Sequence, residues 1–160
     1  MRINICLGIL LALFSSVKGE EWRGIKPLYS TRADVEQILG KPIDKFGMVY
    51  KLPTESATIE YSDGVCSEDY DDWNVPKDTV VSIRVGFQSS LFSELKLDLT
   101  KFEIIKHPNY NNYYYINRVD GIFYDVREDY TTKVENLIAV EYFPAAKDKQ
   151  LLCHKETKEN

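Results

Sequence analysis

The chain has 160 residues, of which 20 are Lys or Arg and 25 are Asp or Glu, so its formal net charge is −5. This acidic balance argues against nucleic-acid partners and anionic lipid surfaces, which both require a basic footprint. The length suits one domain with a substantial hydrophobic core.

Residues 1–19 are predicted to be a signal peptide. A basic start precedes an unbroken apolar run at 5–14, and Val17 and Gly19 supply the small residues expected before a cut ahead of Glu20. The run is too short to cross a membrane core, which needs about 20 residues. We therefore expect an exported protein, periplasmic or secreted, with no transmembrane segment after cleavage. Cleavage removes two basic residues and no acid, which leaves 18 basic and 25 acidic residues and a net charge of −7.

Two cysteines, Cys66 and Cys153, remain after cleavage. Export places them in an oxidising compartment, so a disulfide between them is the simplest prediction, and two unpaired buried thiols are the alternative. By loop-closure entropy the bridge would contribute roughly 4 kcal/mol. The sequence indicates neither a metal site nor a cofactor, because the only histidines, His107 and His154, belong to no CxxC or HxxxH spacing.

One short helix is predicted near the start of the mature chain. Ser30 or Thr31 can cap its N-terminus, and an apolar stripe begins at Val35 and recurs at i+3 and i+4. Gly40 is a favourable C-terminal residue and Pro42 prevents continuation. A helix of this length is not stable alone, so its stripe is expected to pack on a sheet.

After this helix the hydrophobic period changes from 3.6 to 2, which predicts strands. The expected strands are 48–52, 57–61, 81–87, 95–99, 113–119, 122–126 and 136–143, and 102–106 is ambiguous between strand and helix. Asp-Gly pairs at 63–64 and 120–121 predict tight hairpin turns.

Residues 64–87 and residues 121–143 show a weak internal sequence similarity. Each stretch starts at the glycine of an Asp-Gly pair and ends in a predicted apolar strand. This similarity predicts two related hairpin-plus-strand units that pack in one sheet. The alternative is that the residue patterns common to β-meanders produce the similarity without duplication. The predicted fold class is α+β: one short N-terminal helix packed on an antiparallel sheet of about six or seven strands. The predicted single domain covers residues 20–155, and a disordered tail follows at 156–160.

No catalytic signature is present: G-x-S-x-G, P-loop and HExxH motifs are all absent from the sequence. His107 precedes Pro108 with no nucleophile motif nearby, so no catalytic residue is assigned. The densest acidic group is compatible with three interpretations: a solvated loop, an acid/base pair for hydrolysis, or a calcium site. Its members are Asp63, Glu68, Asp69, Asp71 and Asp72.

A tyrosine cluster is the most suggestive feature of the chain. Tyr110, Tyr113, Tyr114 and Tyr115 lie within six residues and are interleaved with asparagines. In a strand Tyr113 and Tyr115 share one face and Tyr114 lies on the other, so one set is expected to be exposed. Exposed Tyr with Asn suits a protein or carbohydrate surface, whereas the alternative is that half of these rings are core.

The stretch EWRGIKPLYSTRADVEQILGKP, with the later WNVPKDTVVSI, resembles a family of uncharacterised exported bacterial proteins that share this opening. Residues 30–42 are also similar to the helix-then-Gly-x-Pro start of small outer-membrane assembly lipoproteins of the SmpA/OmlA type, a start shared by β-lactamase-inhibitor-like folds. Such modules place a short helix against an antiparallel sheet and bind other proteins.

The sequence therefore favours a non-enzymatic, exported binding or interaction module of the cell envelope or secreted space, with a protein or glycan partner. The candidate partner surface is the tyrosine cluster at 110–115. The alternative function is a hydrolase that acts on an extracellular polymer through acidic residues.

Overall fold

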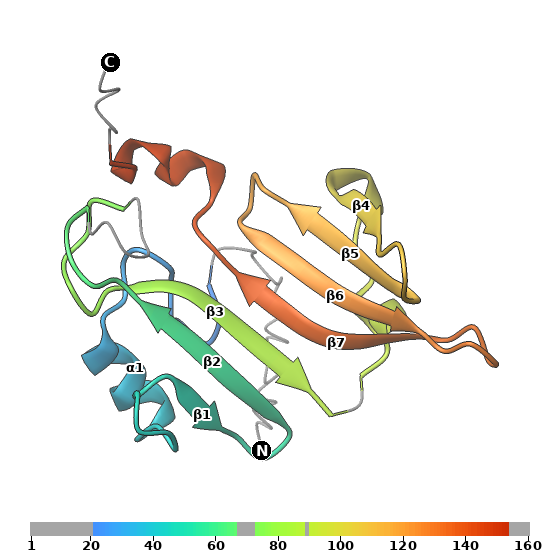
Figure 1. The fold of residues 1–160 in the computed structure, drawn as a ribbon, viewed down its shortest axis with the longest axis horizontal. Helices are drawn as coiled ribbons and strands as arrows, with labels where there is room; N and C mark the ends of the chain where they lie inside the picture. Colours follow the sequence, from blue (N-terminus) through green and yellow to red (C-terminus); the bar gives the residue numbers. More distant parts are fainter. Residues whose placement is uncertain (1–20, 67–72, 89, 154–160) are drawn as a thin grey trace, which may run out of the picture.

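The computed structural model describes residues 21–66, 73–88 and 90–153, and these contain one antiparallel sheet of seven strands (Figure 1). The strand order is β1-β2-β3-β7-β6-β5-β4. The predicted signal peptide and the tail at 156–160 lie outside the described residues. The strands are β1 Val49–Lys51, β2 Glu55–Tyr61, β3 Val80–Phe87, β4 Glu103–Lys106, β5 Asn112–Asn117, β6 Ile122–Glu128 and β7 Glu135–Tyr142.

The α+β prediction is wrong, because the described chain is mainly β. Its one α-helix, α1, spans only Arg32–Leu39, and the other helical segments are short 3-10 turns. The predicted stripe of α1 is incomplete: Val35 is fully buried, whereas Ile38 is 46% exposed. The core is closed instead by Trp22 and Ile25 of the N-terminal segment and by Phe92, together with α1. The helix therefore contributes one part of a cover that is otherwise made of irregular chain.

The ends of α1 follow the sequence signals. Thr31 is the N-cap, and its hydroxyl accepts a hydrogen bond from the backbone N–H of Asp34. The Asp34 carboxylate accepts one in return from the backbone N–H of Thr31, which lowers the pKa of Asp34. Gly40 ends the helix with φ = 84°, a conformation that favours glycine.

Two meanders build the sheet. Strands β1, β2 and β3 follow one another on one side, β4 to β7 do so on the other, and β3 joins β7 through the pairs from Ile83↔Tyr142 to Gly86↔Ala139. The predicted hairpin-plus-strand units are not equivalent, because the described part of residues 64–87 contains β3 alone, whereas residues 121–143 contain both β6 and β7.

The two Asp-Gly pairs behave differently. The pair at 120–121 closes the β5–β6 hairpin as predicted, and Gly121 has φ = 64°. A Cβ at Gly121 would collide with the carbonyl oxygen of Phe143. The prediction for 63–64 is wrong, since β2 and β3 are joined by the long connection 62–79. There Gly64 only forms a local turn in which its N–H donates to the Ser62 hydroxyl at 3.1 Å.

The predicted strand at 95–99 is absent as well. The chain forms two 3-10 helices there, η1 Phe92–Leu95 and η2 Leu99–Lys101. Lys96, between them, has φ = 50°, which breaks any extended run, and Asp98 caps η2 by accepting from the backbone N–H of Thr100. The ambiguous segment 102–106 is the strand β4.

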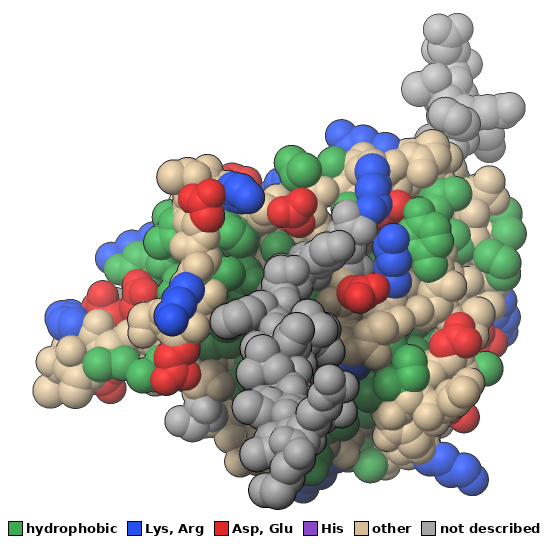
Figure 2. Space-filling model, turned by 180° about the vertical axis from the view of Figure 1, so that it is seen from behind, with side chains coloured by type: hydrophobic (Ala, Val, Ile, Leu, Met, Phe, Trp, Pro, Cys, Tyr) green, Lys and Arg blue, Asp and Glu red, His purple; other side chains and the backbone are tan. Residues whose placement is uncertain are grey.

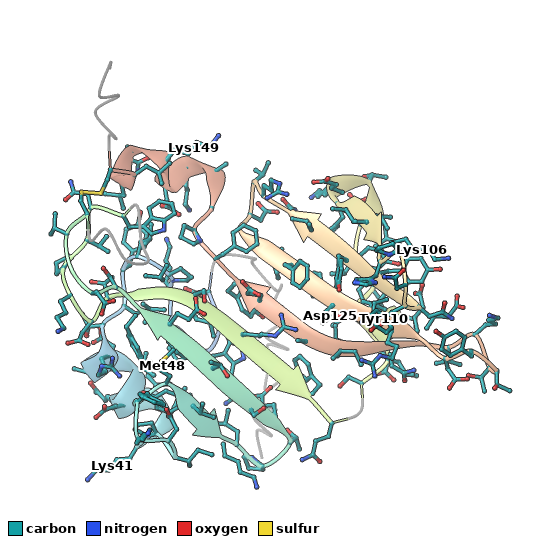
Figure 3. All side chains as sticks on the ribbon, viewed as in Figure 1. Lys41, Met48, Lys106, Tyr110, Asp125 and Lys149 are labelled. Atoms are coloured by element: carbon teal, nitrogen blue, oxygen red, sulfur yellow. A yellow bond between two sulfur atoms is a disulfide. The ribbon has the colours of Figure 1, made fainter. Side chains whose placement is uncertain are left out.

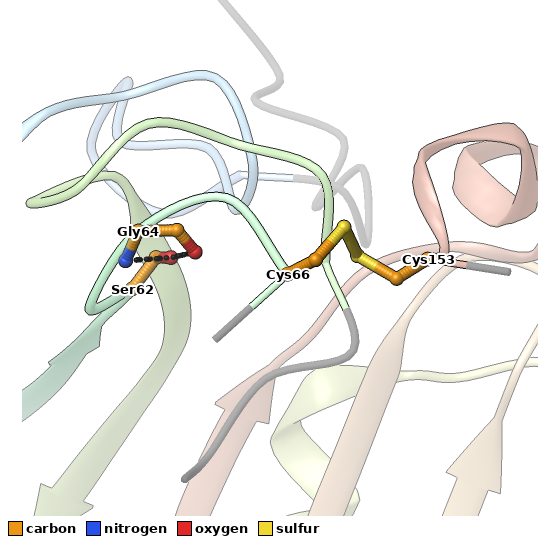
Figure 4. The surroundings of a disulfide bond; sticks show 4 residues. All are labelled: Ser62, Gly64, Cys66 and Cys153. Atoms are coloured by element: carbon orange, nitrogen blue, oxygen red, sulfur yellow. Dashed lines mark hydrogen bonds between the residues drawn. A yellow bond between two sulfur atoms is a disulfide. The ribbon is translucent and has the colours of Figure 1, made fainter. Parts of the chain in front are cut away.

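The predicted disulfide is confirmed: Cys66 and Cys153 are joined, with their Cα atoms 5.7 Å apart (Figure 4). It ties the β2–β3 connection to the chain that follows η3, Ala146–Leu151. No helix within the described ranges is long and apolar enough to span a membrane.

The two faces of the sheet differ in cover. In Figure 1 the strands lie in front, with no helix drawn across β3, β7, β6 and β5. The core side chains of these strands pack with Trp22, Ile25 and Phe92 on the other side of the sheet. The back of the molecule carries acidic and basic side chains interspersed with hydrophobic ones (Figure 2). We call the uncovered side the open face. Its side chains come from the alternate strand positions that do not enter the core, such as Arg84, Tyr114, Phe123, Asp125 and Arg127.

Candidate functional site

The tyrosine cluster is divided between the two faces as strand alternation predicts. Tyr115 is only 5% exposed and lies in the core, with its ring centroid 4.4 Å from that of Phe92. Tyr113 packs partly against the same core. Tyr114 points to the open face, and Tyr110, in the β4–β5 loop, is 64% exposed. Of the four tyrosines in the cluster, Tyr110 and Tyr114 are therefore the two placed for contact with a partner.

These two tyrosines line an open pocket of about 410 Å³ on the open face, within the size range of small-molecule sites. Its floor is formed by the paired strands β5 and β6, where Asn112 lies directly opposite Arg127. Two loops at the same end of the sheet contribute aromatic walls, Tyr110 from the β4–β5 loop and Tyr130 from the β6–β7 loop. The lining residues are Tyr110, Asn111, Asn112, Tyr114, Arg127 and Tyr130. We call this the tyrosine pocket.

His107 organises the wall that contains Tyr110. Its ring centroid lies 4.8 Å from that of Tyr110 and 6.1 Å from that of Tyr114. Its Nδ1 accepts a hydrogen bond from the backbone N–H of Asn109, and the backbone N–H of His107 donates to the backbone carbonyl of Asn112. The histidine thus fixes the β4–β5 loop and has a structural role at the pocket.

Asp129 organises the β6–β7 loop, which carries Tyr130. Its carboxylate accepts hydrogen bonds from the backbone N–H groups of Thr131 and Thr132 at 2.9 and 2.7 Å. These bonds, with Thr132 the larger contributor, lower the pKa of Asp129. Tyr130 itself is 69% exposed. Both aromatic walls therefore rise from loops that are held by local hydrogen bonds.

A chain of polar contacts continues from the pocket floor across the open face. Nδ2 of Asn112 donates to Oδ1 of Asp125 at 3.1 Å, and Arg84 pairs with Asp125 at 3.0 Å and with Glu141 at 3.3 Å. Figure 3 shows Asp125 on β6 and Tyr110 and Lys106 toward the same end of the sheet. Because its carboxylate already binds Asn112 and Arg84, Asp125 holds the side chain of Asn112 in place on the pocket floor.

Arg127 differs from Arg84 in having no ion-pair or side-chain hydrogen-bond partner within the described ranges. It lies on the open face, and its side chain is exposed. The nearby acids are already engaged, Asp125 by Arg84 and Glu128 by Lys133 at 3.1 Å. The guanidinium of Arg127 is therefore a positively charged hydrogen-bond donor that is available to a ligand in the pocket.

The acidic group singled out in the sequence is mostly outside the described residues, since only Asp63 falls within them. The calcium and acid/base interpretations of that loop stay untested. Among the described side chains, no group of three or more His, Cys, Asp or Glu could hold a metal ion. The carboxyl groups with a resolved pKa shift, those of Asp34, Asp44, Asp98 and Asp129, are all lowered by hydrogen bonds.

Sequence reasoning missed Arg127 and Tyr130. A signal for Arg127 was present: the hairpin turn at 120–121 sets a register in which Asn112 pairs with Arg127. Tyr130 gave no comparable signal, because its position depends on the shape of the β6–β7 loop.

No protein-family model matches the chain, and no curated protein matches it significantly. Among solved structures, it is similar to the crystal structure of a DUF4309 family protein (YjgB) from Bacillus subtilis subsp. subtilis str. 168, at a TM-score of 0.47 and 15% identity. The match covers 79% of this chain and 89% of that one. A likeness at this level neither assigns the chain to that family nor indicates a ligand.

Proposed function

We propose that the protein is an exported, non-enzymatic binding module and that the tyrosine pocket is its ligand surface. The observation that carries this proposal is the pair of exposed aromatic rings, Tyr110 and Tyr130, that two loops at the same end of the sheet bring to one open pocket. Exposed tyrosines combine apolar contact area with a polar tip, which is the composition of ligand-binding anchors.

The acidic side chains beside the pocket are engaged in structural contacts. The carboxylates that flank the pocket, Asp125 and Asp129, are occupied by an ion pair and by backbone N–H groups.

Affinity capture from an envelope extract tests this function. Immobilised mature protein is compared with the double variant Tyr110→Ala/Tyr130→Ala and with Phe46→Ala, which removes an exposed aromatic side chain outside the pocket. We expect the wild type and Phe46→Ala to retain the same species and the double variant to lose them. Equal retention by all three proteins would show that the pocket is not the binding surface.

Export is part of the same proposal and is tested separately. The apolar run at 5–14 and Gly19 predict a mature chain that begins at or near Glu20. Intact-mass measurement on protein from the periplasm or the medium should give this N-terminus. Accumulation of the full-length chain in the cytosol would contradict it.

A further inference from the structure

We propose that the tyrosine pocket recognises a sugar unit that carries a carboxylate, set among neutral sugars of a glycan chain. The inference rests on the proposed function, and it adds the chemical class of the ligand.

The first step concerns Arg127. A guanidinium without an intramolecular partner, on the floor of a pocket, provides a planar set of donors that matches a carboxylate. The acids that could neutralise it are engaged elsewhere: Asp125 with Arg84 and Asn112, and Glu128 with Lys133. An incoming carboxylate would therefore pair with Arg127 without displacing an existing ion pair.

The second step concerns the two asparagines. Asn112 uses its amide NH₂ for Asp125, and Asn111 directs its NH₂ toward Glu128 at 3.5 Å. Within the described ranges the side-chain carbonyl oxygens of both residues have no hydrogen-bond partner, so they remain as acceptors in the pocket. The pocket thus combines amide acceptors, which suit hydroxyl donors, with a cationic donor, which suits an anion. A hydroxylated carboxylate satisfies both requirements.

The third step separates a glycan from an extended peptide. Peptides bound as added strands need an unpaired strand edge. The pocket lies over β5 and β6, and both edges of each strand are paired: β5 with β4 and β6, and β6 with β5 and β7. No main-chain ladder is open at this site. The aromatic walls and the polar floor instead suit the apolar face and the polar rim of a sugar ring.

The fourth step concerns charge density. The mature chain has a net charge of −7, so a polymer with an anion on every unit would be repelled at long range. The one guanidinium among the pocket's lining residues, that of Arg127, can pair with one carboxylate at a time. A glycan in which acidic sugars alternate with neutral ones meets both conditions.

A binding cycle tests the inference. The probes are a hyaluronan hexasaccharide, in which glucuronate alternates with N-acetylglucosamine, and its carboxyl methyl ester, which keeps the ring and masks the charge. Calorimetry measures both probes against the wild type, Arg127→Gln and the control Arg118→Gln, which changes the same charge in the exposed β5–β6 turn. We expect esterification to weaken the affinity of the wild type for the probe about tenfold or more. Arg127→Gln should bind the acid and the ester with equal affinity. Arg118→Gln should behave as the wild type.

The outcomes distinguish this inference from the proposed function. Equal binding of acid and ester by the wild type, or equal losses of both probes in Arg127→Gln, would overturn the carboxylate assignment. If Tyr110→Ala/Tyr130→Ala still abolishes binding in that case, the pocket remains the ligand surface. Binding of neither probe overturns the inference, and the envelope capture then decides the proposed function alone. Capture that depends on the pocket but is abolished by protease treatment would identify a protein partner and would also overturn the glycan assignment.

Discussion

Replacing Tyr115 with alanine should destabilise the domain strongly, whereas the same change at Tyr110 should have almost no effect on stability. Tyr115 is 5% exposed and contacts Phe92 at 4.4 Å between ring centroids. It therefore buries nearly all of the roughly 200 Å² typical of a tyrosine. At about 25 cal/mol per Å² this corresponds to an upper value of about 5 kcal/mol. Aromatic-to-alanine changes in cores cost about 3–5 kcal/mol, which is the expected loss.

Urea titration and thermal melts of the mature, oxidised protein measure this difference. A loss of 1 kcal/mol should lower the Tm by about 4 °C for a chain of this size, so Tyr115→Ala should melt roughly 12–20 °C early. Tyr115→Phe is the matched control, since it keeps the ring and removes only the hydroxyl that donates to Glu135 at 3.4 Å. It should cost about 1 kcal/mol or less. Tyr110→Ala should stay within about 0.5 kcal/mol of the wild type. Equal losses for Tyr115→Ala and Tyr110→Ala would refute the assignment of the two rings to core and surface.

Three further results are expected from the rest of the fold. Cys66→Ser/Cys153→Ser should lower the free energy of unfolding by about 4 kcal/mol, because the bridge spans 87 positions, and a reductant should destabilise only the wild type. Gly121→Ala should cost more than about 1 kcal/mol, since the new Cβ meets backbone in addition to the strain of a positive φ. Gly64→Ala has open space around its Cβ and carries only the strain of its φ of 137°, so it should cost less in parallel urea titrations. Burial raises the pKa of Tyr142 to about 12, above the unfolded value of about 10. The corresponding contribution to the free energy of unfolding is fully present below pH 10 and should fall as the pH rises from 10 through 12. Over the same range the tyrosinate absorbance of the folded protein should appear at a higher pH than that of the unfolded chain. A free energy of unfolding that stays flat over this range would contradict the burial.

Local signals in the sequence predicted the features that local chemistry determines. The helix ends follow from the capping residues Thr31 and Gly40, and the β5–β6 hairpin follows from the Asp-Gly pair at 120–121. The split of the tyrosines follows from strand alternation, which places Tyr115 in the core and Tyr114 on the open face.

The incorrect predictions concern residues whose conformation depends on distant parts of the chain. The leucines at 95–99 alternate as in a strand, but the chain there forms 3-10 turns, with Phe92 buried in the core and Lys96 at φ = 50°. Ile38 is exposed, and Trp22 and Ile25 of the N-terminal segment pack in the core beside Val35. The wall formed by Tyr130 depends on the hydrogen bonds that Asp129 makes in its loop. None of these relations can be recognised from hydrophobic periodicity.

The join between the two meanders has a consequence for the rate of folding. Each meander forms from strands close in sequence, but β3 must find β7 across roughly 60 residues of chain, and such non-local pairing slows folding. The bridge between Cys66 and Cys153 offers a shorter path between the same strands, of roughly 30 residues. Halving a loop saves about 0.6 kcal/mol of closure entropy, so the oxidised chain should refold about threefold faster than the reduced one if this pairing limits the rate. Stopped-flow refolding of the two forms would show whether the docking of β3 on β7 is the slow step.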